Sequence, residues 1–222
     1  MVFFHSAVYG GGDILNVSFA EENPNSTEAE QVQRLGALFF SMGLGCMIGP
    51  LILEPFTNMD NPRTILDACV LAFGLQAIGC LGVGYFHSFT FTLLSTTIRA
   101  MGSSISWIDS QVLLQMVVKS DMLGRVVAID FGLALAAEAL SAMLAGLLQD
   151  KLQISPRQVS MMMGGVAIVF FVLWLCYRIF FSNAIFITIH GEFDLPEDAE
   201  NADNKLDIER VAIEQTALLV KS

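Results

Sequence analysis

Charged side chains are scarce in this chain of 222 residues. Asp, Glu, Lys and Arg make up 15% of it, whereas a soluble domain carries about 25%. Hydrophobic residues reach 54%, and the mean hydropathy is +0.61. Basic residues are fewer than acidic ones, 11 against 22, and they are not clustered in any part of the sequence. The composition therefore excludes an ordinary soluble domain, and it excludes a polybasic surface for nucleic acid or anionic lipid.

Motifs for metal binding and catalysis are also missing. The four cysteines form no CxxC pair and the three histidines are scattered, so we expect no metal and no cofactor. The sequence contains no HExxH, GxSxG or P-loop motif. Gly10-x-Gly12-Asp13 matches the GxGD pattern of intramembrane aspartyl proteases, but we place it in a loop, and the chain has no Tyr-Asp partner motif. We therefore do not expect an enzyme.

The first 20 residues lack the basic start of a signal peptide. Their apolar run breaks at Gly10-Gly11-Gly12-Asp13, which makes it too short to span a membrane. We interpret residues 1–20 as the end of a helix whose beginning lies upstream. The chain is then expected to be a piece of a longer protein.

Long apolar stretches occupy most of the remaining chain. A helix needs roughly 20 predominantly apolar residues to cross a bilayer, and lipid requires every backbone polar group to be satisfied internally. Five stretches reach that length: 34–53, 65–86, 88–118, 126–149 and 158–177. We predict an all-α, polytopic transmembrane bundle over residues 1–191, in contact with the lipid bilayer. Residues 192–222 hold nine acidic residues and are expected to form a largely disordered cytoplasmic tail.

The short connections predict how the spans are arranged. Only His87 and Ser88 separate the second and third stretches, which indicates a tight antiparallel hairpin. Gly45 and Gly49 form a small-xxx-small pair that would let another helix approach closely. The polar segment 21–33 is read as an outside loop, because Asn25 and, more weakly, Asn16 begin N-glycosylation triplets.

Ionisable side chains at membrane depth are the candidates for function, because such groups are costly unless they face a cavity or a partner. Four qualify: Arg99, Asp109, Asp130 and Glu138. Each could belong to a substrate or proton path, or could make a fixed ion pair or lie near the headgroups. Glu138 is the strongest candidate, because it lies in the middle of its stretch and could hold and release a proton.

Three segments together resemble the C-terminal half of a major facilitator superfamily transporter: GLGCMIGPLILEPF, RAMGSSISW and LLQMVVKSDMLGRVVAIDFGLALAAEAL. The similarity is to the branch of multidrug and siderophore exporters. In that branch a helix ending in Leu-Leu-Gln is followed by a short cytoplasmic turn and by Gly-Arg-Val, which opens the next helix. Leu113-Leu114-Gln115 and Gly124-Arg125-Val126 match these two motifs. The resemblance implies that residues 1–20 end helix seven and that the five stretches are helices eight to twelve. It further implies a missing N-terminal half and a small-molecule substrate.

Two functions from different classes remain open. The first is secondary transport by alternating access, with protons as a candidate coupling ion. The second is a non-transporting membrane assembly or scaffold subunit that uses the acidic tail to bind a partner. Transport by the full-length gene product would separate them.

Orientation is the first testable consequence. We expect 21–33, 86–88 and 150–157 outside, and 54–64, 119–125 and the tail inside. Single cysteines placed in 21–33 and in 192–222 should react with an impermeant thiol reagent from opposite sides. Reaction of both sites from the same side would refute this topology.

Overall fold

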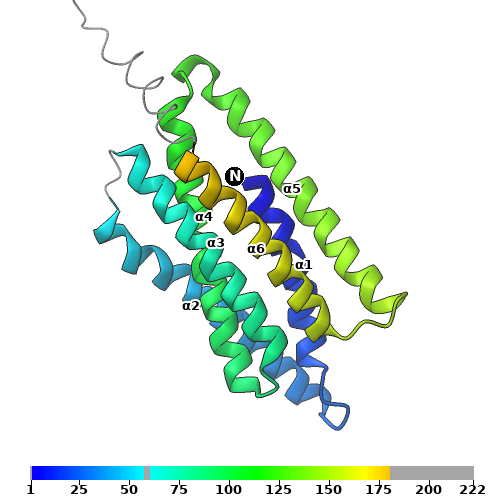
Figure 1. Ribbon diagram of the computed structural model, residues 1–222. Coiled ribbons are helices and arrows are strands. Elements are labelled where there is room, and N and C mark those ends of the chain that lie inside the picture. Colours follow the sequence, from blue (N-terminus) through cyan, green and yellow to red (C-terminus); the bar gives the residue numbers. More distant parts are fainter. Residues whose placement is uncertain (1, 58–60, 181–222) are drawn as a thin grey trace, which may run out of the picture. The chain divides into compact units, whose positions relative to one another are not determined.

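A computed structural model describes residues 2–57 and 61–180. The predicted tail, 192–222, lies outside this part. The described chain forms six α-helices and one short 3-10 helix (Figure 1). They are α1 (Val2–Ala20), α2 (Glu28–Leu53), η1 (Glu54–Phe56), α3 (Pro62–Tyr85), α4 (Phe89–Val117), α5 (Ser120–Asp150) and α6 (Pro156–Phe180). The prediction of an all-helical protein is confirmed for these residues.

Four segments are long and apolar enough to cross a membrane: Glu28–Phe56, Arg63–Tyr85, Ser120–Asp150 and Pro156–Phe180. They cover the first, second, fourth and fifth predicted spans. The third predicted span, 88–118, is also a single helix, α4, but it does not belong to this set. The reason is that its buried side is polar, with Thr92, Ser95, Thr96, Arg99, Ser103, Ser106, Asp109 and Ser110.

Two predicted loops are shorter than expected. Part of the polar segment 21–33 is helical, because Thr27 and Glu30 form a capping box that starts α2 at Glu28. The segment 119–125 is likewise almost entirely helical, since α5 begins at Ser120 with Asp121 in its first turn. An acidic side chain there is favourable next to the free N–H groups of a helix start.

The break expected at Gly10–Asp13 does not exist. Helix α1 runs without interruption through all three glycines, so the GxGD pattern lies within a helix and not in a loop. Each of these glycines is buried and faces a neighbouring chain segment at close range. A Cβ at Gly10 would lie 2.8 Å from Glu138 Cα on α5. Packing thus outweighs the low helix propensity of glycine.

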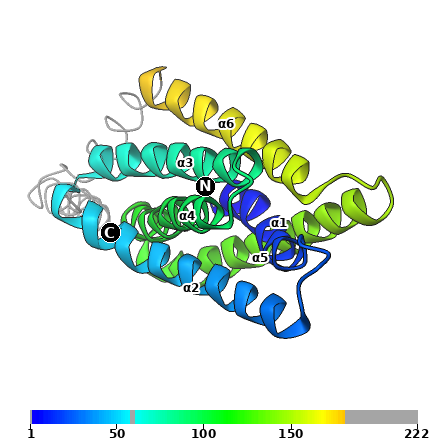
Figure 2. The same ribbon diagram turned by 90° about the horizontal axis from the view of Figure 1, so that it is seen from below.

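The helices pack in a regular pattern. Helix α1 packs along α5, α2 along α4, and α3 along both α4 and α6. Seen along the bundle, α1 and α4 lie in the middle, with α3 and α6 on one side (Figure 2). Helices α2 and α5 flank the central pair but do not pack along one another. Residues of α1 and α4 that remain partly exposed include Tyr9, Asp13 and Trp107.

Glycines allow the close contacts around α4. A Cβ at Gly45 would lie 2.7 Å from Ala100 Cβ, and one at Gly49 would lie 2.9 Å from Met101 Cα. Gly45 and Gly49 are thus the positions at which α2 comes close to α4. On the other side, a Cβ at Gly102 would lie 2.7 Å from the backbone nitrogen of Gln76 on α3.

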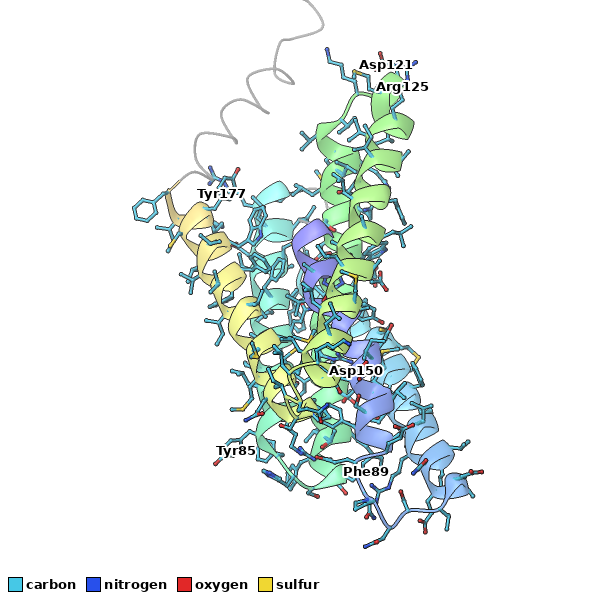
Figure 3. The ribbon with its side chains drawn as sticks, turned by 90° about the vertical axis from the view of Figure 1, so that its right-hand side faces the viewer. Tyr85, Phe89, Asp121, Arg125, Asp150 and Tyr177 are labelled. Carbon is cyan, nitrogen blue, oxygen red and sulfur yellow. The ribbon has the colours of Figure 1, made fainter. Side chains whose placement is uncertain are left out.

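Successive helices run in opposite directions, so their connections lie at alternate ends of the bundle (Figure 1). Tyr85, Phe89 and Asp150 lie toward one end, and Asp121 and Arg125 toward the other (Figure 3). The predicted hairpin between the second and third stretches is present, with α3 ending at Tyr85 and α4 starting at Phe89. Which end faces the cytoplasm stays a prediction.

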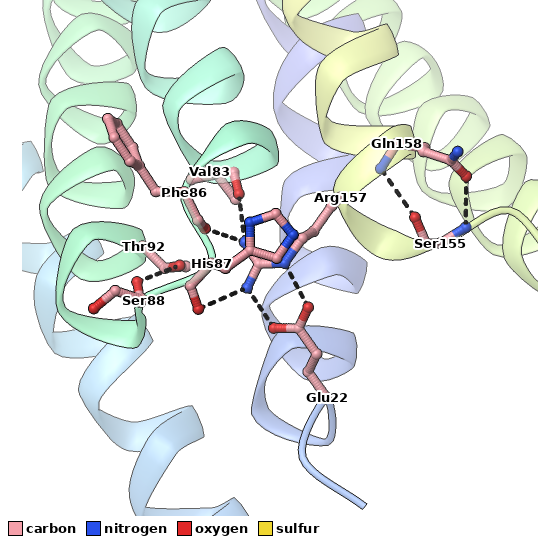
Figure 4. A network of polar contacts seen from close by, with 9 residues as sticks. All are labelled: Glu22, Val83, Phe86, His87, Ser88, Thr92, Ser155, Arg157 and Gln158. Atoms are coloured by element: carbon pink, nitrogen blue, oxygen red, sulfur yellow. Dashed lines mark hydrogen bonds and ion pairs between the residues drawn. The ribbon is translucent and has the colours of Figure 1, made fainter.

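Arg157 joins three elements at one end of the bundle (Figure 4). Its Nε and Nη2 donate to the two carboxylate oxygens of Glu22, each at 2.5 Å. Nη1 donates to the carbonyls of Val83 and Phe86, and Nη2 also donates to that of His87. All five N–H groups of the guanidinium are thereby used. Arg157 ties the start of α6 to the end of α3 and to the residues after α1.

Packing at Gly45 can be tested with a matched control on the same helix. We expect Gly45→Ala to lower stability by about 1–3 kcal/mol, because the added methyl overlaps α4. Gly43→Ala should leave stability unchanged or raise it by up to about 1 kcal/mol, because nothing lies within 4 Å and alanine favours helix. Thermal unfolding in detergent measures both. Equal effects of the two variants would refute the packing assignment.

Candidate functional site

Polar side chains line the contact between α1 and α4. On α1 they recur at His5, Tyr9 and Asp13, and on α4 at Arg99, Ser103 and Trp107. Residues four apart share one side of a helix, so each set forms a stripe. The helices are antiparallel, so His5 lies beside Ser103 and Gly12 beside Arg99. With Glu138 of α5, we call these residues the central cluster: His5, Tyr9, Asp13, Arg99, Ser103, Trp107 and Glu138.

The Arg99 side chain is buried, with 5% of the residue exposed. Its guanidinium lies against the backbone of α1 in the space that a side chain at position 12 would occupy. Glycine at position 12 is therefore required for this placement. No carboxylate oxygen of the described residues lies within 4 Å of the guanidinium, and Nε has no hydrogen-bond partner among them. Arg99 is a buried cation without a direct ion pair in this part of the chain.

Glu138 lies next to α1 at the level of Gly10. Its side chain is partly exposed, and it makes no ion pair within 4 Å in the part of the chain that the structure describes. A fixed ion pair of Glu138, one of the alternatives considered from the sequence, is therefore not found among these residues. Asp13 of α1 carries a charge of the same sign and repels the Glu138 carboxylate. Asp13 in turn lies within the electrostatic reach of Arg99.

Aromatic rings continue the cluster away from Asp13. The His5 ring stacks on Tyr9 with centroids 5.8 Å apart, and its edge faces Trp107 at 6.3 Å. Trp107 meets Phe131 of α5 at 5.2 Å. His5 is 3% exposed, and one nitrogen is 3.2 Å from Ser103 Oγ. Its Nδ1 has no hydrogen-bond partner in residues 2–57 and 61–180.

Asp109 and Asp130 lie further along the bundle. Asp109 is ten residues beyond Arg99, or about 15 Å along α4. It is 4% exposed and lines a cavity of about 250 Å³ together with Glu54 and Thr57. Asp130 accepts a 3.0 Å hydrogen bond from Gln111 of α4. Arg99 and Glu138 both lie against the glycine segment of α1, at Gly12 and Gly10, whereas Asp109 lies apart from it.

The remaining candidate residues lie at the surface or in packed helix. Gly124 has nothing within 4 Å, and Arg125 is exposed near the start of α5. Asn25 is exposed in the connection between α1 and α2, whereas Asn16 is 2% exposed within α1. Asn25 is therefore the accessible acceptor of the two. No group of three or more potential metal ligands occurs among the described residues.

Sequence reasoning missed the contribution of α1. His5, Tyr9 and Asp13 were assigned to a helix end and a loop, so their spacing of four residues was not interpreted. That spacing on an apolar background was the available signal. The three glycines hid it, because they suggest a chain break where they are in fact positions of close helix contact.

Comparison of the chain with protein-family models, curated proteins and solved structures finds no match.

Two buried arginines on this scaffold should respond in opposite ways to the same substitution. Arg99→Met removes an unpaired buried charge and keeps most of the packing, so we expect stability to be unchanged or higher. Arg157→Met leaves three backbone carbonyls without their donor, while the exposed Glu22 carboxylate can turn to water, so we expect a cost of about 1–3 kcal/mol. Thermal unfolding of both variants in one detergent gives the comparison. A loss at Arg99 as large as that at Arg157 would make Arg99 a structural residue.

Proposed function

We propose that this chain is the C-terminal half of a secondary transporter of the major facilitator superfamily. Its six helices α1–α6 would be helices seven to twelve, and α4, the third predicted span, would be helix ten. The complete protein would carry a small molecule by alternating access, with two halves rocking around a site near the middle of the membrane.

The arrangement of the helices is the observation that supports this proposal. The six helices divide into two sets of three, in which α1 corresponds to α4, α2 to α5 and α3 to α6. Under this correspondence the α1–α5 contact becomes the α4–α2 contact, and both contacts are extensive. The α3–α6 contact is converted into itself. Helices α1 and α4 run in opposite directions (Figure 1), so the two sets of three would be related as an inverted repeat, with the difference that α3 packs on α4 far more extensively than α6 packs on α1. Each half of a major facilitator transporter contains such a repeat.

The polar groups support the same function. In a repeat of this kind, α1 and α4 are equivalent helices, and they carry most of the central cluster. Ionisable groups at membrane depth are expensive and tend to face a cavity or a transport path. Tyr9, Asp13 and Trp107 are partly exposed although they lie on the two central helices. A second half placed over this surface would enclose them at a shared site.

Glu138 is the proposed proton carrier. It is partly exposed, it lies beside Asp13, and no cation of the described residues holds it in a fixed pair. A carboxyl group in this position is free to take up a proton when water reaches it from one side and to release it to the other. The chain alone lacks the second wall of the site, so it should not transport by itself.

Transport can be measured with the full-length gene product in proteoliposomes. A trapped pH dye reports proton movement while a panel of charged and neutral solutes is offered under an imposed pH gradient. We expect at least one solute to move protons in the wild type. Glu138→Gln should insert normally and lose pH-driven transport, because the amide keeps the shape but cannot ionise.

Asp121→Asn is the matched control for that variant, because Asp121 is an exposed acidic residue at the start of the same helix. It should transport like the wild type. Unchanged pH-driven transport in Glu138→Gln would assign Glu138 a structural role. Absence of any solute-dependent flux would favour the scaffold function.

A further inference from the structure

We propose that a groove between α5 and α6 binds one acyl chain of a membrane phospholipid. The α5 wall of this groove runs from Ala137 to Leu148, its α6 wall runs from Val159 to Val166, and Val8 of α1 lies on its floor. We call it the α5–α6 groove. The inference goes beyond the proposed transport function and does not depend on it, because it requires only that α5 and α6 cross the bilayer.

The groove exists because two consecutive helices do not pack along each other. Helices α5 and α6 are joined by a short connection, yet they scarcely touch, and each contacts α1 instead (Figure 2). The space left between them is a cavity of about 290 Å³. Cavities that hold small ligands begin at about 300 Å³, so the groove is large enough for part of a hydrocarbon chain.

The lining of the groove suits hydrocarbon and not water. Ser141 is the one polar side chain among the described residues that line it, and its Oγ already accepts a 3.1 Å hydrogen bond from the backbone nitrogen of Gly11. Water in the groove would therefore lack polar partners. An empty groove would cost its lining side chains their dispersion contacts. Leu144 and Met162 line the groove and are half exposed, so a chain can enter it from the surrounding lipid.

The length and depth of the groove match one leaflet of the bilayer. From Ala137 to Leu148 its α5 wall rises about 16 Å. The hydrocarbon core is about 30 Å thick, so one leaflet contributes about 15 Å. Ala137 and Val166 lie near the middle of the apolar stretches 126–149 and 158–177, whereas Leu148 lies near the connection to α6. The groove thus runs from the centre of the bilayer to one surface, as a single acyl chain does.

A basic side chain lies where the head group of the lipid would lie. Lys151 follows Leu148 by about one turn, so both lie on the same side of the chain. It is exposed and makes no ion pair within 4 Å in the part of the chain that the structure describes. Asp150 points away from Leu148, because successive helix residues are about 100° apart. A lipid whose chain fills the groove would bring its phosphate to Lys151, which attracts it.

Photolabelling with a phospholipid tests this inference. The full-length protein is placed in phosphatidylcholine vesicles that contain a small fraction of phosphatidylcholine with a diazirine on one acyl chain, and labelled residues are located by mass spectrometry. We expect Met162 to be labelled at least about threefold more than Met161, because a chain held in the groove contacts Met162 for longer. Met161 is the matched reference, since it has the same side chain, adjacent depth and similar exposure (43% against 51%) but does not line the groove.

Filling the groove provides a second test. Leu144→Trp places a larger side chain in it and should lower the labelling of Met162 by about threefold or more. Met143→Trp is the control and should leave this labelling unchanged, because Met143 is similarly exposed on the same helix but does not line the groove. Both variants replace side chains that are half exposed, so neither disturbs the packed interior.

The head group is tested with Lys151→Gln, which should lower the labelling of Met162 by the phospholipid about two- to fivefold. A long-chain alcohol with the same diazirine has no phosphate, so its labelling should not respond to this variant. Equal labelling of Met161 and Met162 would overturn the inference, as would labelling of Met162 that survives Leu144→Trp. Labelling of Met162 by the alcohol alone would overturn the assignment to a phospholipid, and an unchanged phospholipid label in Lys151→Gln would overturn the contact with the head group.

Discussion

Close approach of helix backbones around α4 is the constraint on which the rest of this structure depends. Helix α4 is polar on its buried side, and it is tolerated there because neighbouring helices enclose it on several sides. Gly45 and Gly49 bring α2 against it, and Gly79 and Gly102 bring α3 equally close. Without these contacts the serines, threonines and charges of α4 would face lipid. The glycine positions therefore determine where polar groups can be placed at membrane depth.

The same constraint acts on α1 and produces the candidate site. Gly10 allows α5 to approach, which brings Glu138 level with Tyr9 and Asp13. Gly12 leaves the space that the Arg99 guanidinium fills. Gly10 and Gly12 thus set the places of one carboxylate and one cation against α1, and Gly11 admits Met163 of α6.

The sequence predicted the parts of the fold that depend on local hydrophobicity and failed where packing decides. Four predicted spans are helices of sufficient length and apolar character, since a long apolar run requires no knowledge of its neighbours. The Gly45–Gly49 contact was predictable because the spacing itself is the signal. The continuity of α1 was not predictable, because glycine disfavours helix. Its role in close packing becomes apparent only when the neighbouring helix is known. For the same reason Arg99 and Glu138 were found as single residues, while the cluster that unites them was not.

Arg157 explains how such a bundle could move without losing its interior. Its five hydrogen bonds fix α6, the end of α3 and Glu22 to one another at the end that carries the α3–α4 turn (Figure 4). Helices α3 and α6 also pack along each other and form the side away from α2 and α5 (Figure 2). Alternating access requires each half to move largely as a rigid body around the substrate. In the proposed transporter, the α3–α6 side would therefore move as one unit, and Glu138 lies on the other side, on α5.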